Sequence, residues 1–161
     1  FPPEQVGNLY IGPLDFTPAG QAISLVDFAA PDLQRFPRFA QAMQHAQSAV
    51  LAPGDAVFIP SLWWHHMEGL DAFNILVNYW WRPVAAWRDA PMNALMLALL
   101  AVRDLPVAQR AAWQAMFNHY VFDADEATAA HIPVAARGVL GTLDEPAAAH
   151  LRAILRQRLE R

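Results

Sequence analysis

The chain has 161 residues, a formal net charge of −4 and no cysteine. The missing cysteines exclude disulfides and thiolate metal sites, and the acidic balance argues against a broad nucleic-acid-binding face. The longest apolar run, 94–102, is too short to cross a bilayer. No signal peptide is visible, so we expect a cytoplasmic protein.

The first part of the chain predicts short elements separated by loops. Residues 1–5 indicate one turn of helix with proline at a permitted first position, and 22–28 a short strand. A helical segment is expected over 31–46, interrupted by Pro37. Phe36 and Phe39, three positions apart, should pack together there. Arg35 and Arg38 should stay solvated.

The next stretch is the most informative in the chain. Pro53-Gly54-Asp55 predicts a tight turn, followed by a strand to Ile59 and a break at Pro60-Ser61. A new strand then carries two tryptophans and two histidines, and 74–81 supplies another. Because side chains alternate along a strand, the two histidines should point to opposite faces: Trp63, His65 and Met67 on one face, and Trp64, His66 and Glu68 on the other.

The pattern becomes helical after residue 85. An amphipathic stripe is expected over 92–100, and a second helix should restart after Pro106. Asp144-Glu145-Pro146 is typical of a helix start. The last helix should bury one apolar stripe, formed by Leu151, Ile154, Leu155 and Leu159. Its basic residues should stay solvated: Arg152, Arg156 and Arg158.

Four segments occur in an order that resembles a known family: FPPEQVGNLY, VDFAAPDLQRFPRF, PGDAVFIPSLWWHHMEGL and ILVNYWW. Together they resemble the C-terminal part of the cupin-like JmjC family of Fe(II)- and 2-oxoglutarate-dependent oxygenases, such as the asparaginyl hydroxylase that acts on hypoxia-inducible factor. The resemblance implies a partial double-stranded β-helix (cupin or jelly roll) over 1–84. A C-terminal helical bundle over 85–161 would then pair two protomers as a homodimer.

The resemblance also implies a site. His65 would be the distal metal ligand, with its ring turned inward from the barrel wall toward a cavity. Asn78 and Trp80 would line the 2-oxoglutarate side, and His66 on the opposite face would be structural. No residue of this chain is assigned as catalytic in its own right.

The family's HxD/E metal pair, which lies upstream of the FPP segment, has no counterpart in this sequence, and there is no lysine to grip 2-oxoglutarate. The one His-x-Glu spacing, His66 and Glu68, follows the distal histidine and is a minor alternative as a chelating pair. One histidine does not hold iron. The chain is therefore expected to be a fragment of a hydroxylase, inactive alone.

Three functions stay open at this point. The first is an oxygenase acting on a protein side chain, a modified tRNA base or a small molecule, with Fe(II) and 2-oxoglutarate as cofactors. The second is a catalytically silent cupin-like binding or dimerisation module. The third, a metal-dependent isomerase or dioxygenase of the wider cupin group, would need a cluster of histidines or glutamates that the sequence does not display. No membrane or nucleic-acid signature favours a partner of either kind.

Overall fold

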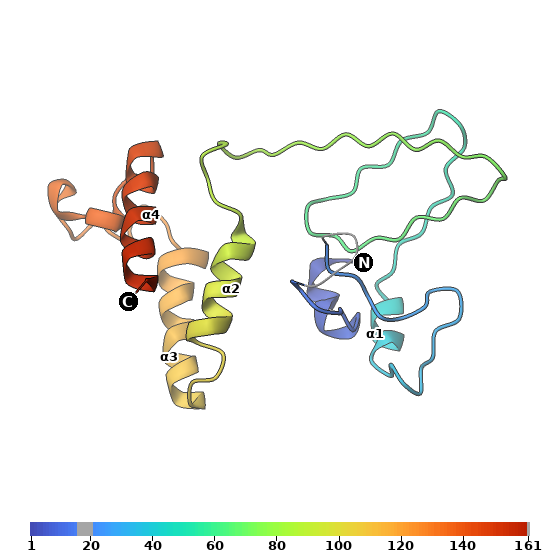
Figure 1. Ribbon diagram of the computed structural model, residues 1–161, viewed down its shortest axis with the longest axis horizontal. Coiled ribbons are helices and arrows are strands. Elements are labelled where there is room, and N and C mark those ends of the chain that lie inside the picture. Colours follow the sequence, from blue (N-terminus) through green and yellow to red (C-terminus); the bar gives the residue numbers. More distant parts are fainter. Residues whose placement is uncertain (16–20, 161) are drawn as a thin grey trace. The chain divides into compact units, whose positions relative to one another are not determined.

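The computed structural model describes residues 1–15 and 21–160 (Figure 1). The chain separates into two compact units, Phe1–Val77 and Asn78–Arg161. The division expected from the sequence, a barrel segment over 1–84 and a helical region over 85–161, stays a prediction.

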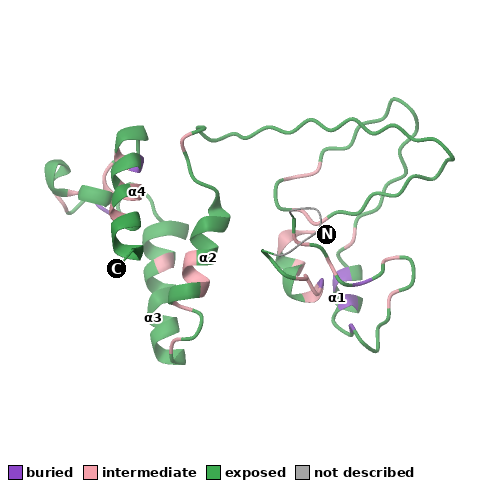
Figure 2. Ribbon diagram, viewed as in Figure 1, coloured by how far each residue is buried: buried purple, intermediate pink, exposed green. Residues whose placement is uncertain are grey.

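A small aromatic core holds the first unit together. Two short helices contribute to it, the 3₁₀ helix η1 (Pro3–Asn8) and α1 (Phe39–Met43). Phe39 is 0% exposed at its centre, and Figure 2 shows the buried residues gathered at α1. The buried set is Leu9, Val26, Phe36, Phe39 and Ala42, with Phe1, Tyr10, Ile11, Phe28 and Trp64 packed against it.

The helix expected over 31–46 is shorter than the sequence predicted. The Asp32 carboxylate accepts hydrogen bonds from the main-chain N–H groups of Gln34 and Arg35, both at 3.0 Å, which closes a turn rather than a helix. α1 begins only after Pro37, which has no N–H to give to a continuous helix. The prediction that Phe36 and Phe39 pack on the same side is confirmed, because both belong to one buried core cluster.

The two arginines beside this core are exposed, as predicted. Each guanidinium also lies over an aromatic ring, with Arg35 5.0 Å from the centre of Phe36 and Arg38 4.9 Å from that of Tyr10. Such cation–π contacts contribute up to about 1 kcal/mol at exposed sites. The aliphatic stems thereby cover the edge of the core.

The expectation of a partial double-stranded β-helix is wrong for this structure. The described residues contain no sheet; a single isolated antiparallel bridge joins Ile11 and Ser24. Segments 46–52, 55–60, 63–70 and 74–82 form neither helix nor ladder. A strand is stable only when its main-chain groups are paired and one face is covered. The strands were predicted from apolar alternation alone. The described residues supply no neighbouring strands to pair with them.

Both turns of the central stretch are confirmed. The Asp55 N–H donates to the Ala52 carbonyl (3.0 Å), and Gly54 has a φ of 94°, a left-handed value suited to glycine. The second turn is closed by the Trp63 N–H donating to the Pro60 carbonyl (3.2 Å). Here Leu62 takes a φ of 64°, which is uncommon for a residue with a bulky side chain.

The second unit is helical, as the sequence predicted. It contains α2 (Pro91–Ala101), α3 (Val107–Phe117), a π-helical turn η2 (Asn118–Phe122), two 3₁₀ turns η3 (Val134–Ala136) and η4 (Gly138–Leu140), and α4 (Glu145–Leu159). The predicted start of the last helix is confirmed, because the Asp144 carboxylate accepts from the Ala147 N–H at 2.9 Å. This satisfies one of the N–H groups that a helix leaves unpaired at its first turn.

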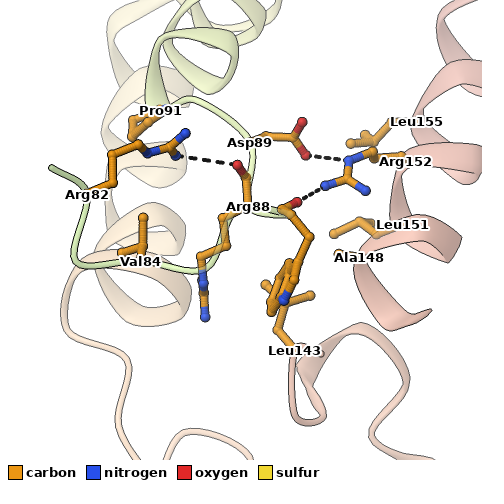
Figure 3. A pocket seen from close by; sticks show the side chains of 11 residues that line it. Arg82, Val84, Arg88, Asp89, Pro91, Leu143, Ala148, Leu151, Arg152 and Leu155 are labelled. Carbon is orange, nitrogen blue, oxygen red and sulfur yellow. Dashed lines mark hydrogen bonds and ion pairs between the residues drawn. The ribbon is translucent and has the colours of Figure 1, made fainter. Parts of the chain in front are cut away.

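Two expectations about these helices need correction. α2 is apolar on every side except at Asn93, so it is not amphipathic. Arg152 of α4 is not simply solvated, because its Nε donates to the Asp89 carboxylate at 2.7 Å and its guanidinium also donates to the Trp87 carbonyl (Figure 3). Among the described helices, none combines the length and apolar character that a bilayer crossing requires.

Candidate functional site

The tryptophan–histidine segment is attached to the beginning of the chain. The main-chain N–H of Trp64 donates to the Phe1 carbonyl (3.0 Å), and the Phe1 ammonium donates to the Trp64 carbonyl (2.9 Å). Burial lowers the pKa of this ammonium below its ordinary value. The indole of Trp64 packs against the aromatic core. This pairing fixes which face of the segment is turned toward the core.

His66 lies on the same face as Trp64. Its ring stacks on that of Phe28, with ring centres 5.3 Å apart and an angle of 19° between the planes. Phe28 in turn contacts Phe1 and Phe39, at 5.5 Å between ring centres in both cases. The imidazole of His66 is therefore part of the aromatic packing of the first unit.

His65 has different surroundings. Its Nδ1 lies 3.0 Å from the carbonyl oxygen of Trp63. A carbonyl oxygen can only accept, so Nδ1 must be the donor in this hydrogen bond, and in the neutral ring Nε2 then keeps its lone pair. This is the arrangement found in metal-binding histidines, where a hydrogen bond on one ring nitrogen orients the other toward the metal.

From the sequence, the ring of His65 was expected to face the interior of a barrel. In the structure it does not. The residue is exposed. The reason is the missing sheet: among the described residues, no facing strand covers this side of the segment. His66 is exposed as well, but its ring contacts the core residue Phe28, whereas the hydrogen bond of His65 is to the Trp63 carbonyl.

The described residues do not complete an iron site. They contain no group of three histidine or carboxylate side chains that could hold a metal ion. Glu68, two positions after His66, is exposed, and His66 is engaged with Phe28. A facial triad needs two histidines and a carboxylate that converge. In this segment, His65 has a hydrogen bond at Nδ1 that would orient Nε2 toward a metal.

The two residues predicted to contact 2-oxoglutarate belong to the other unit. Asn78 is its first residue, and both Asn78 and Trp80 are exposed, Trp80 at 76%. Their assignment therefore stays a prediction.

Sequence reasoning missed two features that position His65. One is the pairing of Phe1 with Trp64, which no local pattern indicates. The other is the left-handed Leu62 in the turn before the segment. The Pro60-Ser61 break signalled a turn there, but leucine gave no sign of an unusual backbone.

A model of the family described as cupin-like domain matches residues 1–86. This chain therefore belongs to the cupin-like domain family, and the JmjC-type resemblance drawn from the sequence is confirmed.

Among curated proteins, the chain is similar to HSPB1-associated protein 1 of Homo sapiens, with 36% identity over 80 residues, which is 50% of this chain and 16% of the relative. It is 45% identical to lysine-specific demethylase 8 of Xenopus tropicalis over 58 residues, 36% of this chain and 12% of that protein. It is 35% identical to tRNA wybutosine-synthesizing protein 5 of Danio rerio over 82 residues, 51% of this chain and 22% of that protein. The matched segments thus span less than a quarter of each relative, and no solved structure matches significantly.

Proposed function

We propose that this chain supplies one part of the site of an Fe(II)- and 2-oxoglutarate-dependent hydroxylase, with His65 as one of its metal ligands. The observation that carries the proposal is the hydrogen bond from Nδ1 of His65 to the Trp63 carbonyl, which leaves Nε2 able to bind a metal. Membership of the cupin-like domain family supports it, since the matched segment includes this histidine.

The other protein ligands must come from outside these 161 residues. His66 and Glu68 have the only His-x-acid spacing in the sequence, and the ring of His66 is stacked on Phe28. The chain alone is accordingly inactive. Asn78 and Trp80 would contact 2-oxoglutarate in the assembled site.

The substrate class stays a protein side chain, a tRNA base or a small molecule. The names of two relatives, a lysine-specific demethylase and a tRNA wybutosine-synthesizing protein, support the first two classes. We also propose a cytoplasmic location.

The test measures succinate formed from 2-oxoglutarate by a polypeptide that joins this chain to a segment bearing an HxD/E pair. We expect His65→Ala to abolish iron-dependent succinate formation. Asn78→Ala should raise the KM for 2-oxoglutarate. His131→Ala, in the second unit, is the matched control and should leave turnover unchanged. Unchanged turnover in His65→Ala would refute the assignment.

A second candidate, a catalytically silent binding or dimerisation module, is favoured by one observation: the described residues contain no set of three metal ligands. The same assay separates the two functions. Iron-dependent succinate formation by the joined polypeptide supports the hydroxylase, and its absence in a folded, iron-treated sample supports the module.

Homodimerisation through the C-terminal helices is part of both candidates. Its support is the exposure of four apolar side chains along α2: Met92, Leu95, Met96 and Leu100. Leu100 is 79% exposed. Exposed apolar patches of this kind mark interaction sites. Sedimentation analysis should find a dimer that Leu100→Glu dissociates. Val134→Glu in η3, also at an exposed apolar position, should leave the dimer intact, and a monomeric unmodified chain would exclude the proposal.

A further inference from the structure

The carbonyl that His65 contacts is directed by a residue at the beginning of the chain. Nδ1 of His65 lies 3.0 Å from the Trp63 carbonyl oxygen. That carbonyl shares a peptide group with the Trp64 N–H, which donates to the Phe1 carbonyl at 3.0 Å. The described peptide bonds are trans, and in a planar trans peptide group the C=O and the N–H point in opposite directions. The Trp63 carbonyl is therefore directed away from Phe1, to the side on which His65 meets it.

The other peptide group of Trp63 is held as well. Its N–H donates to the Pro60 carbonyl at 3.2 Å and closes the turn before the segment. Trp63 thus lies between two peptide groups that each make a main-chain hydrogen bond, which leaves its two backbone dihedrals little freedom. The bond to Pro60 is local, whereas the bond between Trp64 and Phe1 ties the arrangement to the aromatic core.

Phe1 is held in that core by its side chain. Its ring centre lies 5.5 Å from that of Phe28 and 6.0 Å from that of Phe39, which is fully buried. The hydrogen bonds between Phe1 and Trp64 span 63 positions, and closing so long a loop costs conformational entropy. The ring contacts of Phe1 offset this cost and keep its carbonyl beside Trp64.

We propose that Phe1 is a positioning residue for His65. Its ring holds the Phe1 carbonyl against the Trp64 N–H, and the Trp63 carbonyl, fixed in the same peptide group, then orients the imidazole. The inference rests on the proposed function of His65 as a metal ligand. Without the ring of Phe1, the peptide group between Trp63 and Trp64 is free to turn, and His65 loses the partner that directs Nε2.

The first measurement uses the full chain without metal. Nitrogen-15 resonances of the histidine rings report which ring nitrogen carries the proton, and they are recorded at about pH 8, where a free imidazole is neutral. Phe1→Ala should lower the ratio of the Nδ1–H to the Nε2–H form of His65 about threefold or more, as expected for the loss of one hydrogen bond. Phe1→Tyr keeps an aromatic ring and should have the unmodified ratio.

Leu9→Ala is the matched control. Leu9 is 1% exposed in the same core, so its truncation loosens the packing without removing the ring that anchors the Phe1 carbonyl. The ratio at His65 should stay unchanged in this variant, with folding of each variant checked by circular dichroism. If Leu9→Ala does not fold, Val26→Ala, a smaller truncation in the same cluster, takes its place.

The second measurement is the Co(II) affinity of the polypeptide that joins this chain to an HxD/E segment. Groups that orient a metal-binding histidine typically change metal affinity about tenfold or more, so Phe1→Ala should bind Co(II) about tenfold more weakly and Phe1→Tyr like the unmodified chain.

An unchanged ratio at His65 in folded Phe1→Ala would overturn the inference, as would an equal change in the control variant, which would reduce Phe1 to one more core residue. A ratio that responds as expected supports the inference. If Co(II) then leaves the His65 signal of the unmodified polypeptide unperturbed, the proposed function fails while the positioning by Phe1 stands.

Discussion

Trp64 and Phe1, 63 positions apart in the chain, donate one main-chain hydrogen bond each to the other's carbonyl oxygen. This reciprocal pair is the arrangement of two residues directly opposite each other in an antiparallel ladder. It places Trp64 against the aromatic core, and two positions on, the exposed His66 stacks its ring on Phe28. One backbone contact thus assigns different roles to two adjacent histidines.

The two histidines should differ in their effect on stability. His66→Ala removes the ring that stacks on Phe28, and aromatic pairs of this kind contribute about 0.5–1.5 kcal/mol beyond area burial. Both histidines are exposed, but no ring contact is found for His65 in the described part of the chain, so His65→Ala should change the free energy of unfolding by less than about 0.5 kcal/mol. Chemical denaturation of both variants checks this. Equal losses would mean that the segment is not oriented as described.

The core of the first unit should be sensitive at its centre. Phe39 is 0% exposed, so Phe39→Ala leaves a cavity and should lower the free energy of unfolding by about 3–5 kcal/mol. Phe73→Ala is the control, because Phe73 is 79% exposed. Urea unfolding followed by near-ultraviolet circular dichroism is the measurement. A small loss for Phe39→Ala would show that this core does not stabilise the unit.

The first turn of the central stretch should depend on its glycine. Gly54→Ala places a side chain at a φ of 94°, with an expected cost of about 1–2 kcal/mol. Space is not the cause, since a Cβ there would meet no atom within 4 Å. Gly7→Ala is the matched control: its surroundings are equally open, and its φ is not left-handed. Thermal unfolding of the two variants should separate them, and equal effects would contradict the turn geometry.

The last helix should depend on its cap. Asp144→Ala removes the oxygen that accepts from the Ala147 N–H and should lower stability by about 0.5–2 kcal/mol. Asp144→Asn keeps an acceptor oxygen and should be close to the unmodified chain. Far-ultraviolet circular dichroism during denaturation measures both. An alanine variant as stable as the asparagine variant would mean that the cap contributes nothing.

Local signals in the sequence predicted local structure well. Proline and glycine marked the turn at Gly54, and Asp144-Glu145-Pro146 marked the start of α4, because these features depend on neighbouring residues only. The packing of Phe36 with Phe39 also followed from their spacing. The expected extent of the helix over 31–46 was wrong, since Asp32 closes a turn instead.

The features that could not be predicted from the sequence depend on contacts between residues far apart in the chain. The strands expected around Val57 and Val77 followed from alternation and composition, but a strand needs a partner, and alternation does not supply one. The pairing of Phe1 with Trp64 and the hydrogen bond from Arg152 to the Trp87 carbonyl each join segments more than sixty positions apart. The histidine to choose as ligand came from family resemblance, and the structure adds a hydrogen bond between its Nδ1 and the Trp63 carbonyl.

The assignment of His65 as a metal ligand is tested most directly on the polypeptide that joins this chain to an HxD/E segment. Co(II) is added as a paramagnetic substitute for Fe(II), and the magnetic resonance of isotope-labelled histidine rings is recorded. We predict that the Nε2 signal of His65 broadens beyond detection or shifts far from its position, whereas the signal of His131, which is not a proposed ligand, is unaffected. Binding of the metal with the His65 signal unchanged would contradict it.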